Sequence, residues 1–194
     1  MAAIDAVNAE DPNVVVVEGV GRPKELVHAE LMTRWLIELD PTPDDAQRLA
    51  ARAHHLRRWA LPRSQYPDGR AGYLRWRTEQ RRRHAAEVAS ILDAVGYDAA
   101  IINRVTQIVS KQGLRATGAD DAAVQTHEDA LCLTFLITQL EDLANDLGAA
   151  RTVEVLAKTV AKMSEAALAR AQHLELSPQA SALLADALVA AGRR

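Results

Sequence analysis

The sequence predicts an all-α fold, a compact single-domain bundle of six to eight helices. Apolar residues recur with the 3.6-residue period of a helix in one segment after another. Prolines and glycines stand between these segments, where helices begin and end. The run of four valines at 14–17 could form a strand, but we find no second strand pattern to pair with it. Helices are therefore expected to supply the core.

The expected helices follow from caps and breakers in chain order. Pro23 suits the first turn of a helix that runs to about residue 39. Thr42 can cap the next helix, in which Asp44 and Asp45 favour the positive N-terminal end. That helix is expected to end near Trp59. The remaining segments with helical period are 72–95, 98–111, 121–147, 150–171 and 177–191.

Length and composition limit the class of protein. The 194 residues suit one helical domain over 1–194, on which residues 1–22 pack as an N-terminal arm. Cys132 is the single cysteine, which excludes an intramolecular disulfide and is typical of a reducing compartment. The N-terminus lacks the pattern of a signal peptide. The longest apolar stretches, 14–17 and 130–137, are shorter than the roughly 20 residues that span a bilayer. We expect a cytoplasmic protein with no membrane partner.

The net charge of −3 hides an uneven distribution. The window 51–90 contains ten arginines, no lysine and three acids, so its formal charge is +7 and the rest of the chain carries −10. Four of the seven aromatic residues also lie in this window. Arginines interleaved with rings suit bidentate contacts with anions and cation–π stacking. The alternative interpretation is a solvated helix face that pairs with acidic helices.

Several polar residues occupy positions where the helical period predicts the core. His28 and His84 each lie on an apolar stripe, and Glu25 precedes His28 by one turn on the same side. Asp129 and Glu128 stand above leucines in a later helix. A buried carboxylate without a partner costs several kcal/mol or takes up a proton. These groups therefore need partners, which they can provide for one another. His127 and His173, in contrast, are expected to face solvent.

Histidines and a carboxylate on three different helices indicate a metal site. A single histidine on an apolar face is more often a hydrogen-bonded core residue, but imidazole and carboxylate together are the usual ligands of Fe, Mn or Zn. His54 and His55 are neighbours in a helix, so we expect at most one of them to face the centre. The predicted ligands of a divalent transition metal (Mn, Fe, Co or Zn) are His28, His54, His55 and Asp129.

A resemblance to a known family covers nearly the whole chain. It is carried by the stretches AIDAVNAEDPN, RPKELVHAELMTRWL, AARAHHLRRWALPRSQYPDGRAGYLRWRTE, VGYD, HEDALCLTFL and KTVAKMSE. They resemble the uncharacterised family catalogued as domain of unknown function four-two-zero-two, which implies a shared fold. His28 and His54 stand where that family's pattern accepts other residues. The polar positions that match the pattern are Glu25, His55, Arg58, Arg63, Tyr66, Arg70, Trp76, Arg77, His84, Glu128, Asp129, Lys162 and Ser164.

A second resemblance is to the HD-domain metal phosphohydrolases. A helix with His28, a later AARAHH and then Asp129 are similar to the His … His-Asp … Asp order of that family. The resemblance implies an HD-domain-like all-α fold, one or two divalent metals and hydrolysis of nucleotide phosphoesters. The central His-Asp pair reads His54-His55 here, so one acidic ligand of that pattern is missing. The same architecture also hosts iron-dependent oxygenases, which form a further alternative.

The leading functional hypothesis is an HD-like metal-dependent hydrolase that acts on a phosphorylated small molecule, of which a nucleotide is the first candidate. Glu128 is expected to orient a ligand or act as a base, and His84 to act as general acid or anion contact. We expect His84 to lie within reach of Glu128 or Asp129, in one site. The expected substrate-binding residues are Arg58, Arg63, Tyr66, Arg70, Trp76, Arg77 and Lys162.

Two other hypotheses remain open. The chain could be a non-catalytic nucleotide- or RNA-binding protein that uses the segment 57–84 without metal. It could also be a helical scaffold in which the buried polar residues form only a hydrogen-bond network. The expected partner is an anionic small molecule or nucleotide, with RNA as the alternative. A homo-oligomer stays open.

Overall fold

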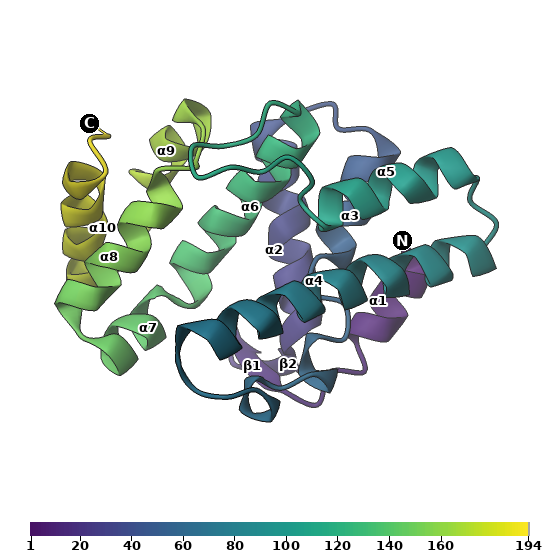
Figure 1. Ribbon diagram of the computed structural model, residues 1–194, viewed down its shortest axis with the longest axis horizontal. Coiled ribbons are helices and arrows are strands. Elements are labelled where there is room, and N and C mark those ends of the chain that lie inside the picture. Colours follow the sequence, from purple (N-terminus) through teal and green to yellow (C-terminus); the bar gives the residue numbers. More distant parts are fainter. Residues whose placement is uncertain (194) are drawn as a thin grey trace. The chain divides into compact units, whose positions relative to one another are not determined.

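The computed structural model describes residues 1–193, and these residues are mostly helical with one small two-stranded sheet (Figure 1). This confirms the predicted all-α class. By its internal contacts the chain divides into two units, Met1–Gln112 and Gly113–Arg194. Among the described residues, no helix combines the length and the apolar character needed to cross a bilayer.

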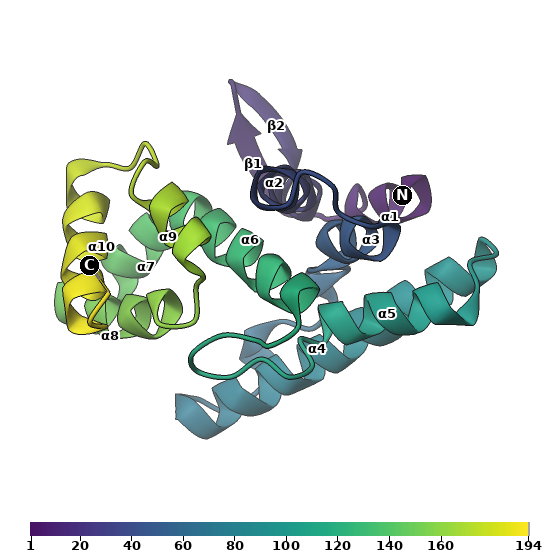
Figure 2. The same cartoon turned by 90° about the horizontal axis from the view of Figure 1, so that it is seen from above.

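The first unit is built around α2, which contacts α1, α3 and both strands. Helices α4 and α5 lie side by side (Figures 1 and 2) and α5 also packs on α3. In chain order the elements are α1 (Ala2–Asn8), β1 (Val14–Val17), β2 (Val20–Pro23), α2 (Lys24–Leu39), α3 (Asp45–Ala53), the 3-10 helices η1 (Arg58–Ala60) and η2 (Arg63–Gln65), α4 (Gly69–Ala94) and α5 (Ala99–Val109).

The second unit is entirely helical within its described residues. Helix α8 packs against α7 and α10, and α6 packs against α9. Their buried faces supply the core of this unit, with Leu133, Leu136, Leu156 and Val160 at 1% exposure or less. The elements are α6 (Ala122–Thr138), α7 (Leu140–Leu147), α8 (Ala149–Val160), α9 (Glu165–Ala171) and α10 (Pro178–Ala190).

The valine run forms one strand of a hairpin, so the expectation that it has no partner is wrong. Residues 14–17 pair antiparallel with residues 20–23, and Val17 lies opposite Val20. Glu18 and Gly19 form the turn with φ of 51° and 80°. Positive φ at both central residues is the geometry of the turn that best matches the twist of a hairpin. The second strand, VGRP, has no apolar alternation, which is why periodicity does not reveal it.

Two segments that the period predicts as continuous helices are each broken. Gln139 separates α6 from α7, with φ of −137° and ψ of −10°. Helix α8 ends at Val160, and the Ser164 side chain caps α9 by accepting a hydrogen bond from the backbone N–H of Ala167. The described residues therefore contain ten α-helices instead of the six to eight expected.

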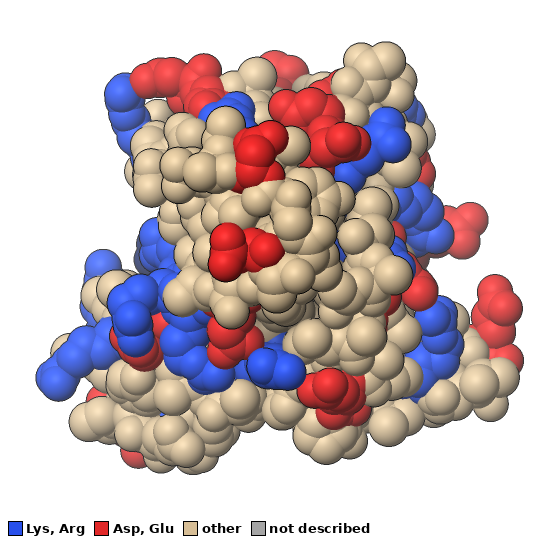
Figure 3. Space-filling model, turned by 90° about the vertical axis from the view of Figure 1, so that its right-hand side faces the viewer, with Lys and Arg blue, Asp and Glu red and all other residues tan. Residues whose placement is uncertain are grey.

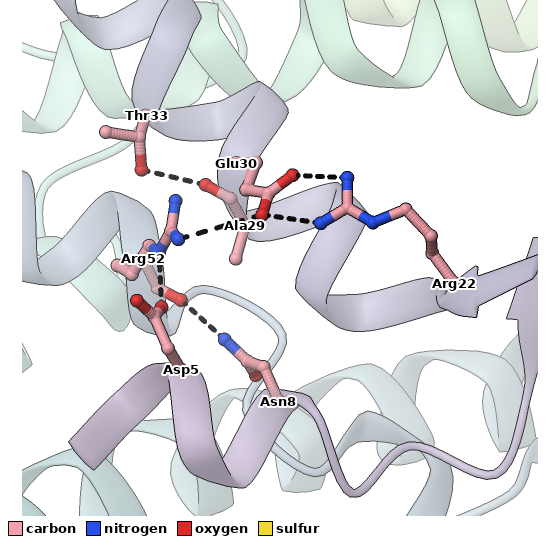
Figure 4. A network of polar contacts seen from close by, with 7 residues as sticks. All are labelled: Asp5, Asn8, Arg22, Ala29, Glu30, Thr33 and Arg52. Atoms are coloured by element: carbon pink, nitrogen blue, oxygen red, sulfur yellow. Dashed lines mark hydrogen bonds and ion pairs between the residues drawn. The ribbon is translucent and has the colours of Figure 1, made fainter. Parts of the chain in front are cut away.

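A polar network around Arg52 of α3 holds α1 and the hairpin to α2 (Figure 4). The Arg52 guanidinium forms an ion pair with Asp5 of α1 and lies 4.0 Å from a Glu30 oxygen on α2. Glu30 also binds Arg22 of β2 through two hydrogen bonds of 2.8 and 2.9 Å. Asn8 of α1 donates to the Arg52 carbonyl at 3.0 Å. One arginine thus ties together elements that lie far apart in the sequence.

The loop between η1 and α4 is fixed to α4 by side chains of that helix. Trp76 Nε1 donates to the Leu61 carbonyl at 2.9 Å. Gln80 Nε2 donates to the same carbonyl at 3.1 Å and to the Arg58 carbonyl at 2.9 Å. The Arg63 guanidinium donates to two backbone carbonyls of its own loop at 2.7 and 2.8 Å. These bonds satisfy backbone acceptors in a segment that contains no α-helix and no strand.

In the second unit, a polar network holds the turn between α8 and α9 to α6. One Asp129 oxygen accepts from the Ser164 backbone N–H at 3.0 Å and from Gln125 Nε2 at 2.9 Å. Gln125 Nε2 also donates to the Lys162 carbonyl at 3.0 Å. The Lys162 ammonium forms an ion pair with Glu128, whose side chain is fully buried. These bonds give Asp129 and Glu128 defined structural partners within their own unit.

The start of α4 leaves no room for a side chain at Gly72. A Cβ at this position would lie 1.9 Å from the Pro67 carbonyl oxygen. We expect Gly72→Ala to lower the free energy of unfolding by about 1–3 kcal/mol, the usual cost of overpacking. Urea denaturation measures this, with Ala71→Ser on the exposed adjacent position as control. Equal stability of the two variants would contradict the close packing of this loop on α4.

The buried pair of Glu128 and Lys162 makes a second expectation about stability. Lys162→Met should lower the free energy of unfolding by about 3–5 kcal/mol, because Glu128 stays buried without its ammonium partner. The double variant Glu128→Leu/Lys162→Met should recover most of this loss, since both charges are then gone. A denaturation-based double-mutant cycle measures the coupling. Additive losses in the double variant would show that the ion pair contributes nothing.

Candidate metal centre

Four histidines from three segments of the first unit come together. The His28 ring on α2 stacks on His55 with centroids 4.1 Å apart and lies 6.2 Å from His54. The His84 ring on α4 lies 5.9 Å from His55 and 6.5 Å from His54. His28, His54 and His84 are 4–6% exposed. The helical period therefore placed His28 and His84 correctly on buried faces.

His54 and His55 both belong to this cluster, so the expectation that only one of them faces inward is wrong. Their rings lie 4.6 Å apart and both approach His28. The physical reason is that α3 ends at Ala53 and does not continue to Trp59. The chain then turns, and Arg57 adopts a left-handed conformation with φ of 49°. Because the two histidines do not lie in the interior of a helix, their side chains are not held about 100° apart.

Glu25 lies beside this cluster at the start of α2. The buried Asp11 carboxylate positions it by accepting a hydrogen bond from the Glu25 backbone N–H at 3.0 Å. Glu25 Oε2 lies 3.1 Å from His55 Nδ1, and His55 Nε2 lies 3.4 Å from Arg58 Nη1. A neutral His55 that carries its proton on Nδ1 satisfies both contacts, since it donates to Glu25 and accepts from Arg58.

Burial dominates the acid–base behaviour of the centre. It raises the pKa of Glu25 to about 7, and the positive charge of Arg58 opposes this rise. Burial also lowers the pKa of His55 well below its usual value, and the neighbouring His28 and Arg58 act in the same direction. The His55 ring is therefore neutral at physiological pH. A neutral imidazole has the free lone pair that metal coordination requires.

His84 is held in the same neutral form. Its pKa is lowered to about 3, mainly by burial, and the charges of Arg58, Arg83 and Lys111 act in the same direction. A hydrogen bond to the His54 backbone opposes the shift. The Nε2 atom of His84 has no hydrogen-bond partner among the described residues, so the bond to the backbone belongs to Nδ1. A histidine with Nδ1–H on a carbonyl and a bare Nε2 is typical of metal ligands.

Three side chains offer a set of donor atoms that could hold a metal ion. One donor atom from each of Glu25, His28 and His55 lies within 4.8 Å of the other two. The combination of one carboxylate with two imidazoles fits Mn, Fe, Co or Zn better than the oxygen-only sets that Mg and Ca prefer. The structure therefore supports the coarse prediction of a site able to bind metal.

An open cleft of about 440 Å³ adjoins this centre at Glu25. Glu25 belongs to both, because it lines the cleft and is one of the three donors. Lys24 and Arg58 bring positive charge to the wall, and Trp59 and Trp76 bring aromatic surface. The Arg58 guanidinium lies over the Trp76 ring, 4.8 Å from its centroid. A ligand in this cleft would meet a cation, an aromatic surface and the donor group together.

The structure brings together only some of the residues that the sequence singled out. Arg58 and Trp76 line the cleft, whereas Tyr66 is half-buried and Arg70 and Arg77 are exposed on α4. Arg63 uses two of its donors within its own loop.

The other predicted site residues lie in the second unit. The pKa of Asp129 is raised by burial and lowered by its bonds from Ser164 and Gln125. The membership of Asp129, Glu128 and Lys162 in one site with the histidines stays a prediction, as does the proximity of His84 to the two carboxylates.

Sequence reasoning did not select Glu25 as a ligand, nor Lys24 as a residue of the cleft. The spacing of Glu25 and His28, one turn apart on one helix face, could have identified the carboxylate as a ligand. No pattern indicates Lys24, because its place in the cleft depends on how the hairpin precedes α2.

A family model described as Domain of unknown function (DUF4202) matches residues 1–184. This match confirms the first resemblance that the sequence suggests, and it covers nearly the whole chain. No curated protein and no solved structure matches the sequence. The resemblance to HD-domain phosphohydrolases has no support from these comparisons.

We expect the purified protein to bind one divalent transition ion through the centre. Glu25→Gln and His55→Ala should each weaken binding by more than about a hundredfold, since even residues that only orient metal ligands contribute 10–100-fold. Affinity should fall as the pH drops below about 7, because Glu25 must lose its proton to bind. Calorimetric titration with Mn²⁺ or Zn²⁺ at several pH values measures both effects.

His173→Ala is the matched control, because His173 is exposed and lies in the turn that follows α9. Its metal binding should equal that of the wild type. Asp129→Asn tests whether the carboxylate of the second unit is a further ligand. Equal metal content in Glu25→Gln, His55→Ala and the wild type would exclude the centre.

Proposed function

We propose that this chain, a member of a family of unknown function, is a metal-dependent hydrolase that acts on a phosphorylated small molecule such as a nucleotide. The observation that carries the proposal is that Glu25 belongs both to the group of potential metal donors and to the wall of the cleft. A phosphate group bound in the cleft beside Lys24 and Arg58 would therefore lie next to the metal centre.

Glu25, His28 and His55 would hold the ion, with His54 and His84 packed around them. When bound, a divalent ion supplies a water molecule of lowered pKa and neutralises charge on the phosphoryl group. His55 would have to carry its proton on Nε2 instead of Nδ1, or rotate, to coordinate through the nitrogen that faces Glu25. Arg58 can then turn from His55 Nε2 to the substrate, because their contact of 3.4 Å is weak.

Arg58 is the residue best placed to bind the phosphate. Its contact with the Trp76 ring keeps the guanidinium at the wall of the cleft, where its donors can reach a phosphate. Lys24 adds a second positive charge on the cleft wall. Fixed donors that face a developing negative charge are commonly the largest contribution to catalysis.

Hydrolysis needs one group to accept a proton from the attacking water and one to return a proton to the leaving oxygen. The water oxygen forms a bond to phosphorus while the ester P–O bond breaks. His84 has a bare Nε2, but burial lowers its pKa to about 3, so it is a weak base at neutral pH. The role of Glu128 as a base is tested by Glu128→Gln.

A non-catalytic nucleotide- or RNA-binding protein is the second candidate function. The pairing of Arg58 with Trp76 favours it, because a cation on a ring also suits recognition of a base and phosphate without chemistry. In that case chelation of metal would leave binding unchanged and no substrate would turn over. An HD-type iron oxygenase, the further alternative, would consume oxygen with Fe²⁺ and release no phosphate.

We expect the Mn²⁺-loaded protein to release phosphate or an alcohol from a panel of nucleotides and p-nitrophenyl phosphates. Glu25→Gln should abolish this activity, and Arg58→Ala should lower kcat by about 10²–10³, the range for removing one stabilising donor. Arg57→Ala is the control, since Arg57 pairs with Glu10 outside the cleft. Nucleotide binding that persists in EDTA without turnover would instead identify a binding protein.

A further inference from the structure

The N-terminal half of α4 carries cations and rings that the metal centre does not use. Arg70, Arg75, Arg77 and Arg81 are exposed, and none of them has an ion pair or hydrogen bond with another described residue. The next two arginines differ, because Arg82 pairs with Glu79 and Arg83 with Glu87. Figure 3 shows one face of the molecule, on which basic and acidic side chains lie interspersed.

Three of these unpaired arginines share one side of the helix. Arg70, Arg77 and Arg81 are separated by seven and four residues, which places them on one stripe. At 1.5 Å per residue the stripe is about 16 Å long. We call these three residues the α4 stripe. Its length exceeds what the phosphate of a single nucleotide needs, so a ligand that uses all of it carries several negative charges.

A series of stacked groups connects the α4 stripe with the cleft. Arg58 lies over Trp76 at 4.8 Å, the Trp76 and Tyr73 rings lie 6.0 Å apart, and Arg77 lies over Tyr73 at 5.7 Å. Tyr73 and Arg77 are also near enough to Arg58 to affect its pKa. The Tyr73 side chain is 44% exposed, so a flat group can approach it from solvent.

We propose that the substrate is the end of a single-stranded nucleic acid. Its terminal phosphate enters the cleft, a base stacks on Tyr73, and the following phosphates lie along the α4 stripe. This inference rests on the proposed function for the role of the cleft. Alternating rings and arginines favour nucleic acid over an acidic protein segment, because bases stack on rings whereas carboxylate side chains do not. Arginine also matches phosphate in a bidentate way.

Binding of a labelled RNA of about ten nucleotides, in the size range of single-strand sites, tests the proposal by fluorescence anisotropy in EDTA. In Arg70→Gln/Arg77→Gln/Arg81→Gln the affinity should fall about a hundredfold at about 0.1 M salt. The slope of log K against log salt should fall by about 2, because each single-strand phosphate contact contributes about 0.7. Tyr73→Ala should weaken binding about tenfold, and Tyr73→Phe should restore it.

The matched control is Arg34→Gln/Arg151→Gln/Arg170→Gln. It removes the same charge from three exposed arginines outside α4 for which no ion pair is found among the described residues. We expect the RNA affinity of this control to stay close to that of the wild type. Equal losses in the two triple variants would overturn the proposal, since net charge alone would explain binding.

Two further outcomes separate this inference from the proposed function. Metal-dependent turnover of a mononucleotide without RNA binding would refute the inference and keep the hydrolase. RNA binding through the α4 stripe with no turnover of any phosphate ester would refute the hydrolase. A polyglutamate peptide that binds the stripe more tightly than RNA would identify an acidic protein partner and overturn the proposal.

Discussion

The first unit depends on the burial of one carboxylate among four imidazoles. Glu25 is 5% exposed, and its carboxylate lies 3.1 Å from Nδ1 of His55, whose ring is neutral. A buried carboxylate of this kind is tolerated only if it holds a proton, a cation partner or a metal. Each surrounding element contributes to this arrangement, since Asp11 fixes the start of α2, the end of α3 turns both histidines inward, and α4 supplies His84.

The pKa shifts of Glu25 and His84 have opposite effects on how stability changes with pH, and these effects cancel between pH 4.5 and 6.5. The pKa of Glu25 rises from 4.5 to about 7 on folding, so its contribution to stability is present below pH 4.5 and is lost as the pH rises through 7. The pKa of His84 falls from 6.5 to about 3, so its contribution is present above pH 6.5 and is lost as the pH falls through 3. Between pH 4.5 and 6.5, Glu25 is protonated and His84 is neutral in the folded chain, whereas Glu25 is charged and His84 is protonated in the unfolded chain. The two groups together therefore bind the same number of protons in both states, and they cause no net change of stability with pH in this range.

Periodicity predicted the burial of His28 and His84 because each lies on a regular helix, where the face follows from the spacing. The same reasoning failed where the helix is interrupted. Both His54 and His55 face the cluster because α3 ends one residue before them. His173 is exposed as expected, but His127 is 1% exposed, because α6 is covered on more sides than one apolar stripe indicates. The hairpin was missed since its second strand depends on a turn and on Arg22, whose partner Glu30 lies on α2.

The desolvation that makes the buried Glu25 carboxylate costly also prepares the centre to bind an ion. With the His55 and His84 rings neutral, each has a lone pair available, and the proton that must leave before a metal binds is on Glu25. A metal would therefore replace a proton and would satisfy the buried carboxylate more fully than His55 does. Arg58 connects this exchange to the cleft, because it contacts His55 on one side and Trp76 on the other. Ion binding at the centre and anion binding in the cleft would thus act on the same guanidinium, so occupation of either site changes the electrostatic field at the other.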